Sequence, residues 1–214
     1  MRTIKKVASH IFIDGFGGMT QGLFATLIIG TMIQQIGLLI GGSTGNVIYL
    51  LGKAAAALTS AGIGVGVAVK YGESPLVTVS AAVAAMVGGY AGKITGGTFF
   101  VDGNAVLAGP GEPLGAFIAA FAGITCGHLV SGKTKVDIIV TPVITIGAGS
   151  VVGLLVGPPI SQMMTGLGSI INWATEQRPF IMGIVVSVVM GMVLTLPISC
   201  LLYTSPSPRD AHES

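Results

Sequence analysis

Residues 19–40, MTQGLFATLIIGTMIQQIGLLI, form an apolar run without a charged side chain and end at the loop sequence GGSTG (41–45). A helix needs about 20 consecutive, mostly apolar residues to cross the hydrocarbon core of a bilayer. This run has that length, and it therefore predicts a transmembrane helix. One such helix is enough to place the chain in a membrane.

The composition of the whole chain supports the same conclusion. Of its 214 residues, 51% are hydrophobic and only 8% are charged, whereas soluble domains use about 25% charged residues. Lipid must therefore cover most of the exterior. The net charge of +2, without a basic stripe, argues against a nucleic-acid partner.

No feature of the sequence points to a metal or a cofactor. Cys126 and Cys200 lack metal-ligand spacing, and an HExxH motif is absent. The Gly-rich stretches lack the strand-then-helix context that a phosphate cradle needs. We therefore expect no cofactor.

Apolar runs with at most one charged residue, Lys53 in the second, predict an all-α, polytopic membrane protein with about six transmembrane helices. The predicted spans are residues 19–40, 46–69, 75–92, 113–131, 138–156 and 180–202. Two further segments, 94–111 and 157–173, are apolar but interrupted by glycine and proline, which predicts broken or re-entrant segments over a cavity. Residues 3–16 place an apolar set opposite Lys5, Lys6 and Ser9, as expected of an interfacial helix. The apolar set is Ile4, Val7, Ala8, Ile11 and Phe12.

The distribution of Lys and Arg predicts the orientation. With the N-terminus inside, two basic residues, Lys93 and Arg178, face outward. The cytoplasmic side then carries Arg2, Lys5, Lys6, Lys70, Lys133 and Lys135. This bias predicts a cytoplasmic N-terminus.

The last residues, 203–214, depart from the pattern of the rest. The polar, Ser/Pro-rich string that follows Leu202 resembles a translated sequencing adapter, and the alternative interpretation is a disordered cytoplasmic tail. The adapter interpretation predicts that 1–202 is an incomplete transmembrane region.

Glu112, in GPGEP (109–113), is the first candidate functional residue. Pro113 suits the first position of a helix, which puts Glu112 at the positive end of the helix dipole. One interpretation is a helix cap. However, Glu is a poor N-cap, and an acid at a membrane break is a functional candidate, so the alternative is an acceptor for sugar hydroxyl groups.

Three further residues are candidates for the same site. Asp102 and Asn104, in VDGNA (101–105), are good turn residues, and both also offer oxygen atoms to a substrate. His128 lies near the predicted cytoplasmic end of its span, where it is either a packing residue or a ligand.

Three segments, 17–37, 94–123 and 141–199, resemble the phosphotransferase-system EIIC membrane proteins, in particular the toxin-regulator (perfringolysin-regulator-like) branch. The resemblance implies a bacterial cytoplasmic-membrane protein that binds a sugar and carries it inward to a cytoplasmic EIIB phosphoryl donor. It implies enzymatic activity only together with EIIB, and commonly a homodimer. It also implies that a glutamate and a histidine contact the sugar, and Glu112 in GPGEP is the match.

Two other functions stay open at this stage. The branch resemblance also implies a non-transporting membrane regulator of gene expression. A passive pore for small solutes is the third hypothesis, although no ring of charged residues supports it.

Overall fold

The computed structural model describes residues 14–101, 104–107, 109–133, 136–175, 183, 187 and 188. The chain divides into two compact units, Met1–Pro158 and Pro159–Ser214. Each unit is described by itself, and the candidate site lies in the first.

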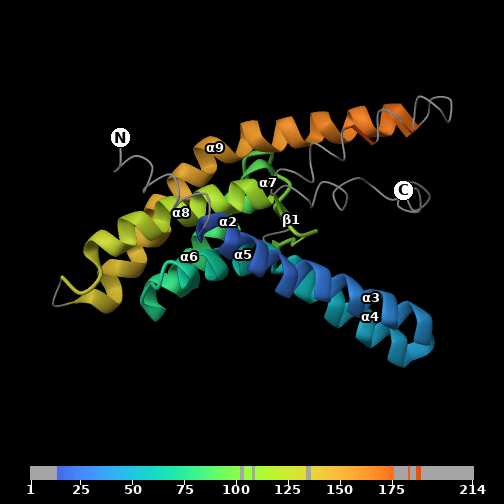
Figure 1. The fold of residues 1–214 in the computed structure, drawn as a ribbon, viewed down its shortest axis with the longest axis horizontal. Coiled ribbons are helices and arrows are strands. Elements are labelled where there is room, and N and C mark those ends of the chain that lie inside the picture. Colours follow the sequence, from blue (N-terminus) through green and yellow to red (C-terminus); the bar gives the residue numbers. More distant parts are fainter. Residues whose placement is uncertain are drawn as a thin grey trace. The chain divides into compact units, whose positions relative to one another are not determined.

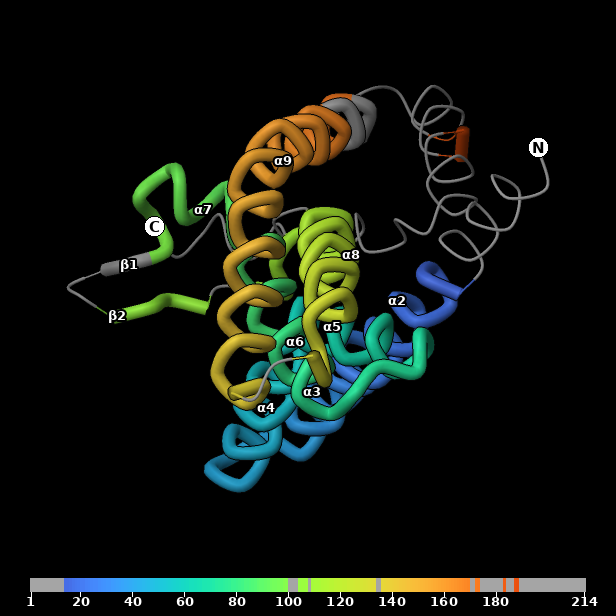
Figure 2. Tube along the Cα trace, turned by 90° about the vertical axis from the view of Figure 1, so that its left-hand side faces the viewer, coloured from blue at the N-terminus to red at the C-terminus, as the bar shows by residue number. Residues whose placement is uncertain are grey.

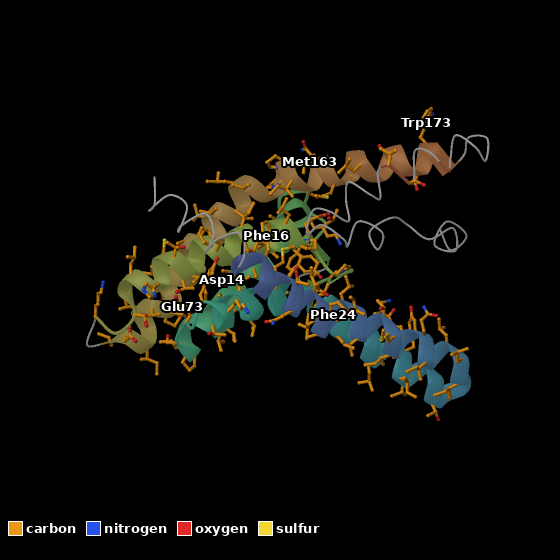
Figure 3. The ribbon with its side chains drawn as sticks, in the orientation of Figure 1. Asp14, Phe16, Phe24, Glu73, Met163 and Trp173 are labelled. Atoms are coloured by element: carbon orange, nitrogen blue, oxygen red, sulfur yellow. The ribbon has the colours of Figure 1, made fainter. Side chains whose placement is uncertain are left out.

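The first unit begins with a long helical hairpin (Figure 1). Its first arm is α2 (Phe16–Leu23), a π-helical turn η2 (Phe24–Ile28) and α3 (Ile29–Ile40). After a glycine in a positive-φ conformation, Gly41, the chain returns through α4 (Gly42–Ala57) and α5 (Thr59–Lys70). Many apolar side chains point outward from this hairpin, including Phe24 at 57% exposure (Figure 3), as expected of a surface that faces lipid.

Glycine pairs allow the two arms of the hairpin to touch backbone to backbone. A Cβ atom at Gly18 would lie 2.5 Å from the carbonyl oxygen of Gly66. The same close approach recurs along the hairpin at the pairs Gly22 and Gly62, Gly30 and Gly52, and Gly37 and Gly45. Small residues at such spacing are the usual means of packing transmembrane helices.

Three longer helices of the first unit follow the hairpin: α6 (Pro75–Gly89), α8 (Pro113–Val130) and the part of α9 (Asp137–Thr175) that belongs to this unit. They lie side by side (Figure 2), with Gly88 of α6 against Gly115 of α8 and Gly123 of α8 against Gly149 of α9. The core is a cluster of apolar side chains in which α2, α5, α6 and α8 meet. Its fully buried members are Met19, Ile63, Val67, Ala68, Val77, Ala81, Ala85, Ala116 and Ala120.

The connection from α6 to α8 contains the two β-strands of the described residues. It consists of α7 (Ala91–Thr95), the two-residue strands β1 (Phe100–Val101) and β2 (Asn104–Ala105), and a turn that leads into α8. The strands pair antiparallel, with Phe100 opposite Ala105. The sequence predicts a broken apolar segment at 94–111, and the structure adds a β-hairpin to it.

The described residues do not confirm the predicted number of about six spans. Within the described residues, three helices are long and apolar enough to cross a membrane: Phe16–Ile40, Pro113–Val130 and Asp137–Ser169. A fourth span is possible if α4 and α5, which bend by 52° at Leu58, count as one broken span. The predicted span at 75–92 is shorter, since α6 ends at Gly89. The predicted span at 180–202, most of the interfacial helix at 3–16 and the tail at 203–214 lie outside the described residues.

The prediction of a broken or re-entrant segment at 157–173 is wrong, because α9 is helical throughout Asp137–Thr175. Pro158 and Pro159 each lack an N–H donor, but the proline ring also fixes φ at a helical value. Transmembrane helices tolerate proline when neighbouring groups satisfy the freed carbonyls. The break in the helices lies at Leu58 instead, where the sequence contains no proline.

Candidate functional site

Glu112 occupies the N-cap position of α8, with Pro113 as the first helical residue. Its backbone is extended (φ −86°, ψ 111°), but its side chain makes no capping hydrogen bond to the first turn. The backbone of Glu112 therefore has the N-cap position and conformation, but its carboxylate does not act as a cap. The half-buried carboxylate remains available to a ligand at the positive end of the helix dipole.

Lys93, at the end of α7, is the charged residue that faces Glu112. Burial raises the pKa of the Glu112 carboxyl, and the positive charge of Lys93 partly offsets this by lowering it. Burial likewise lowers the pKa of Lys93, and Glu112 raises it. The Lys93 ammonium also lies 5.5 Å from the centroid of the Tyr90 ring, within the range of a cation–π contact.

The turn that carries Glu112 is packed closely onto α5 and α6. The Ser60 hydroxyl donates to the Pro110 carbonyl over 3.0 Å, and the Glu112 N–H donates to the Gly89 carbonyl over 2.7 Å. Gly111 has φ 75° and lies against Ser60 and Tyr90, which leaves no room for a Cβ atom. A side chain at position 111 would push the turn, and with it Glu112, away from α5.

The other predicted site residues are distributed differently. Asp102 lies outside the described residues, and Asn104 is exposed in β2, paired with Val101. His128 lies in the last turn of α8, about 24 Å along the helix from Glu112 at 1.5 Å per residue. The structure therefore does not bring His128 to Glu112.

His128 has a partner of its own at that end of the unit. Its Nδ1 lies 3.0 Å from Oε1 of Glu73, which is 9% exposed, whereas His128 is 71% exposed. Glu73 belongs to the turn between α5 and α6 (Figure 3). This contact, together with one between Ser74 and Ser131, joins the α5–α6 turn to the end of α8.

Residues 127–134, GHLVSGKT, match the GxxxxGK[ST] pattern of phosphate-binding loops. That loop must follow a β-strand and open a helix. Here Gly127–Val130 form the last turn of helix α8. The local structure is therefore not that of a nucleotide-binding loop.

Sequence reasoning did not assign Lys93, Tyr90 or Ser60 to the site. Lys93 was recognised only as a charge on the outer side. The sequence does contain a signal that pairs Lys93 with Glu112. Lys93 follows one predicted span and Glu112 precedes the next, and both lie on the same predicted side of the membrane. Ser60 lies in the interior of an apolar helix and gives no such signal.

The fold and this polar turn define a multi-pass helical membrane protein with a charged pair just before one of its spans. The sequence matches the family described as phosphotransferase system, EIIC, over residues 13–202, and the chain belongs to this family. It is therefore related to the membrane components of sugar phosphotransferase transport, for which a sugar substrate and an EIIB partner are general. No curated protein and no solved structure gives a significant match.

Proposed function

We propose that this protein is the membrane-embedded sugar-binding and translocating subunit, EIIC, of a phosphoenolpyruvate-dependent sugar phosphotransferase system. The observation that carries the proposal is the Glu112 carboxylate, which is half-buried at the start of α8, makes no capping bond and faces Lys93. Membership of the EIIC family supports it.

The Glu112 and Lys93 pair has the chemistry that a sugar needs. A carboxylate accepts hydrogen bonds from hydroxyl groups, and an ammonium group donates to their oxygen atoms. Together they suit two neighbouring hydroxyl groups of a neutral sugar, and hydrogen bonds to charged groups are the stronger ones. Asp102 and Asn104, in the hairpin that precedes this turn, are proposed as further contacts.

The phosphoryl group in this proposal comes from a cytoplasmic EIIB protein. The sugar hydroxyl takes the phosphoryl group from EIIB and loses its proton, so the membrane subunit supplies binding and orientation. Phosphotransferase activity would therefore belong to the two proteins together.

We place the protein in the bacterial cytoplasmic membrane with its N-terminus inside. Lys70 at the end of α5 and Lys133 after α8 support this orientation, because the Glu73–His128 contact joins these two helix ends. Lys93 and Glu112 belong to the opposite end of the antiparallel helices α6 and α8, which is then the outer side.

A homodimer is the assembly that the family resemblance implies, and we propose it here. The outward apolar side chains of α3 and α4 support it, since a second copy could cover part of them. They include Met32, Ile36, Leu39, Val47 and Leu51, each more than half exposed except Ile36 at 50%. The molecular mass of the protein in detergent distinguishes a dimer from a lipid-covered monomer.

The decisive test of the function is the formation of sugar phosphate. Vesicles that contain the full chain, supplied with EIIB and its phosphoryl donors, are expected to convert an external sugar from a panel of hexoses, hexitols and disaccharides into internal sugar phosphate. Vesicles without EIIB are the control. A folded protein that binds no sugar and yields no sugar phosphate would overturn the proposal in favour of a membrane regulator.

Sugar binding is expected to weaken as the pH falls. Only the ionised Glu112 carboxylate accepts hydrogen bonds with full charge, and burial raises its pKa above the ordinary value of 4.5. Affinity should therefore fall with a midpoint above pH 4.5, and binding titrations at a series of pH values measure it. The effect on stability has the opposite sign, because a raised carboxyl pKa favours the folded state at low pH.

The control for this prediction is Glu112→Gln, in which the residual affinity should not change over the same pH range. A wild-type affinity that stays constant between neutral pH and pH 4.5 would contradict the assignment of Glu112 as the acceptor.

A further inference from the structure

Two carbonyl groups at the bend between α4 and α5 accept hydrogen bonds from side-chain hydroxyl groups. A helix end that is not exposed to water must satisfy these carbonyls with other donors. The hydroxyl of Thr59, a fully buried residue, donates to the Ala56 carbonyl over 2.6 Å. The next carbonyl, that of Ala57, accepts from the hydroxyl of Tyr90 over 3.2 Å.

The same Tyr90 hydroxyl also donates to the carbonyl of Gly109, the first residue of the turn that leads to Glu112. Tyr90 is only 1% exposed, and burial raises its pKa to about 12, so the phenol keeps its proton as a donor. A phenol has a single hydrogen to share between the two acceptors. Tyr90 therefore lies directly between the bend and the turn.

Two other hydrogen bonds hold the turn, one of them from Ser60 beside the bend. Ser60 binds the Pro110 carbonyl from α5, and the Glu112 N–H binds the Gly89 carbonyl at the end of α6. The ring of Tyr90 is fixed separately, by Phe99 at a centroid distance of 5.4 Å and by Lys93. Loss of the hydroxyl alone would therefore remove one of three hydrogen bonds to the turn without displacing the ring.

We propose that Tyr90 is a positioning residue for Glu112, whose hydroxyl ties the Gly109–Glu112 turn to the α4–α5 bend and so sets where the carboxylate stands. The inference rests on the proposed role of Glu112 in sugar binding. It extends that role, because Tyr90 joins the end of α4 to the turn that carries Glu112 through one hydroxyl group.

The first experiment measures the position of the turn without any sugar. In a cysteine-free background of the full chain, Glu112→Cys is labelled by a membrane-impermeant maleimide, with and without Tyr90→Phe. The labelling rate is expected to rise about fivefold, the equilibrium factor of a typical intramolecular hydrogen bond. Tyr49→Phe, about 12 Å before Ala57 along α4, is the matched control and should leave the rate unchanged.

The labelling of Asn104→Cys tests whether Tyr90→Phe moves only the Glu112 turn or loosens the whole connection from α6 to α8. Its rate in the exposed strand β2 should not respond to Tyr90→Phe. Equal rises at positions 104 and 112, or no rise at 112, would overturn the proposal. If Tyr90→Phe folds poorly, difluorotyrosine at position 90 replaces it: this near-isostere has a lower phenol pKa, so labelling at 112 relative to the tyrosine protein should increase with pH.

A second experiment links the position of the turn to binding, through the thermal shift produced by the same sugar panel. Tyr90→Phe should weaken the binding of any sugar that stabilises the wild type by about fivefold, while the melting temperature of the sugar-free protein falls only as much as the loss of one buried hydrogen bond explains. Faster labelling with unchanged affinity would overturn the proposal. If the wild type binds no sugar, the proposed function fails, whereas the labelling rates still decide whether Tyr90 positions residue 112.

Discussion

Replacing Glu112 by glutamine is expected to weaken sugar binding by about 10- to 100-fold, the range of a hydrogen bond to a charged group. Glutamine keeps the size of the side chain, so the turn at Gly111 need not move. It removes the negative charge that faces Lys93 and replaces one acceptor oxygen by an NH2 donor. Lys93 is then left half-buried without this counter-charge, which further disfavours a neutral ligand.

The measurement is a binding titration of the full chain against each sugar that stabilises the wild type. Glu73→Gln is the matched control, because it makes the same chemical change at the opposite end of α8, beside His128. We expect Glu73→Gln to bind sugar with the affinity of the wild type. We expect the same sugar affinity for His128→Ala. Equal affinities for Glu112→Gln and the wild type would remove Glu112 from the site.

The long apolar spans could be predicted from the sequence because uninterrupted, charge-free length is a local property. The run at 19–40 lies within the continuous helix Phe16–Ile40, and the run at 113–131 corresponds to Pro113–Val130. The break at Leu58 could not be predicted in this way. Its sequence, AAAALTSAG (54–62), contains no proline, and two carbonyls there accept from the hydroxyl groups of Thr59 and of Tyr90, which follows α6.

Proline gave the opposite error at Pro158 and Pro159. Loss of two N–H donors suggests a break, but the ring geometry is compatible with a helix, and α9 continues through both residues. Local breaker signals therefore misplace the break in this chain. The bend occurs where contacts between helices satisfy the backbone.

The sequence could predict only the part of the candidate site that lies within one continuous segment. Glu112 could be recognised from Pro113 and the neighbouring glycines. Its contacts with Lys93, Ser60 and Tyr90 depend on how the connection from α6 to α8 folds back onto α5. The separation of His128 from Glu112, by contrast, follows from the predicted span 113–131, because the two residues stand at opposite ends of the one helix α8.

Alanine substitution of two adjacent glycines is expected to change stability in opposite directions. At Gly18, a Cβ atom would lie 2.5 Å from the Gly66 carbonyl oxygen and 2.7 Å from the Val67 Cα atom, both in the backbone of α5. The two arms of the hairpin would have to separate, and overpacking of this kind costs about 1–3 kcal/mol. At Gly17, the nearest atom is the flexible Lys70 side chain at 3.7 Å, an ordinary contact.

Gly17→Ala should therefore show mainly the effect of helix propensity, a gain of up to about 1 kcal/mol. Melting temperatures of the two variants of the full chain in the same detergent measure the difference. Both substitutions have the same intrinsic effect on the α2 helix, so the difference between them isolates the close approach of α2 and α5. Two variants of equal stability would show that the hairpin does not depend on backbone contact at Gly18, because α2 could then move away from α5 at no cost.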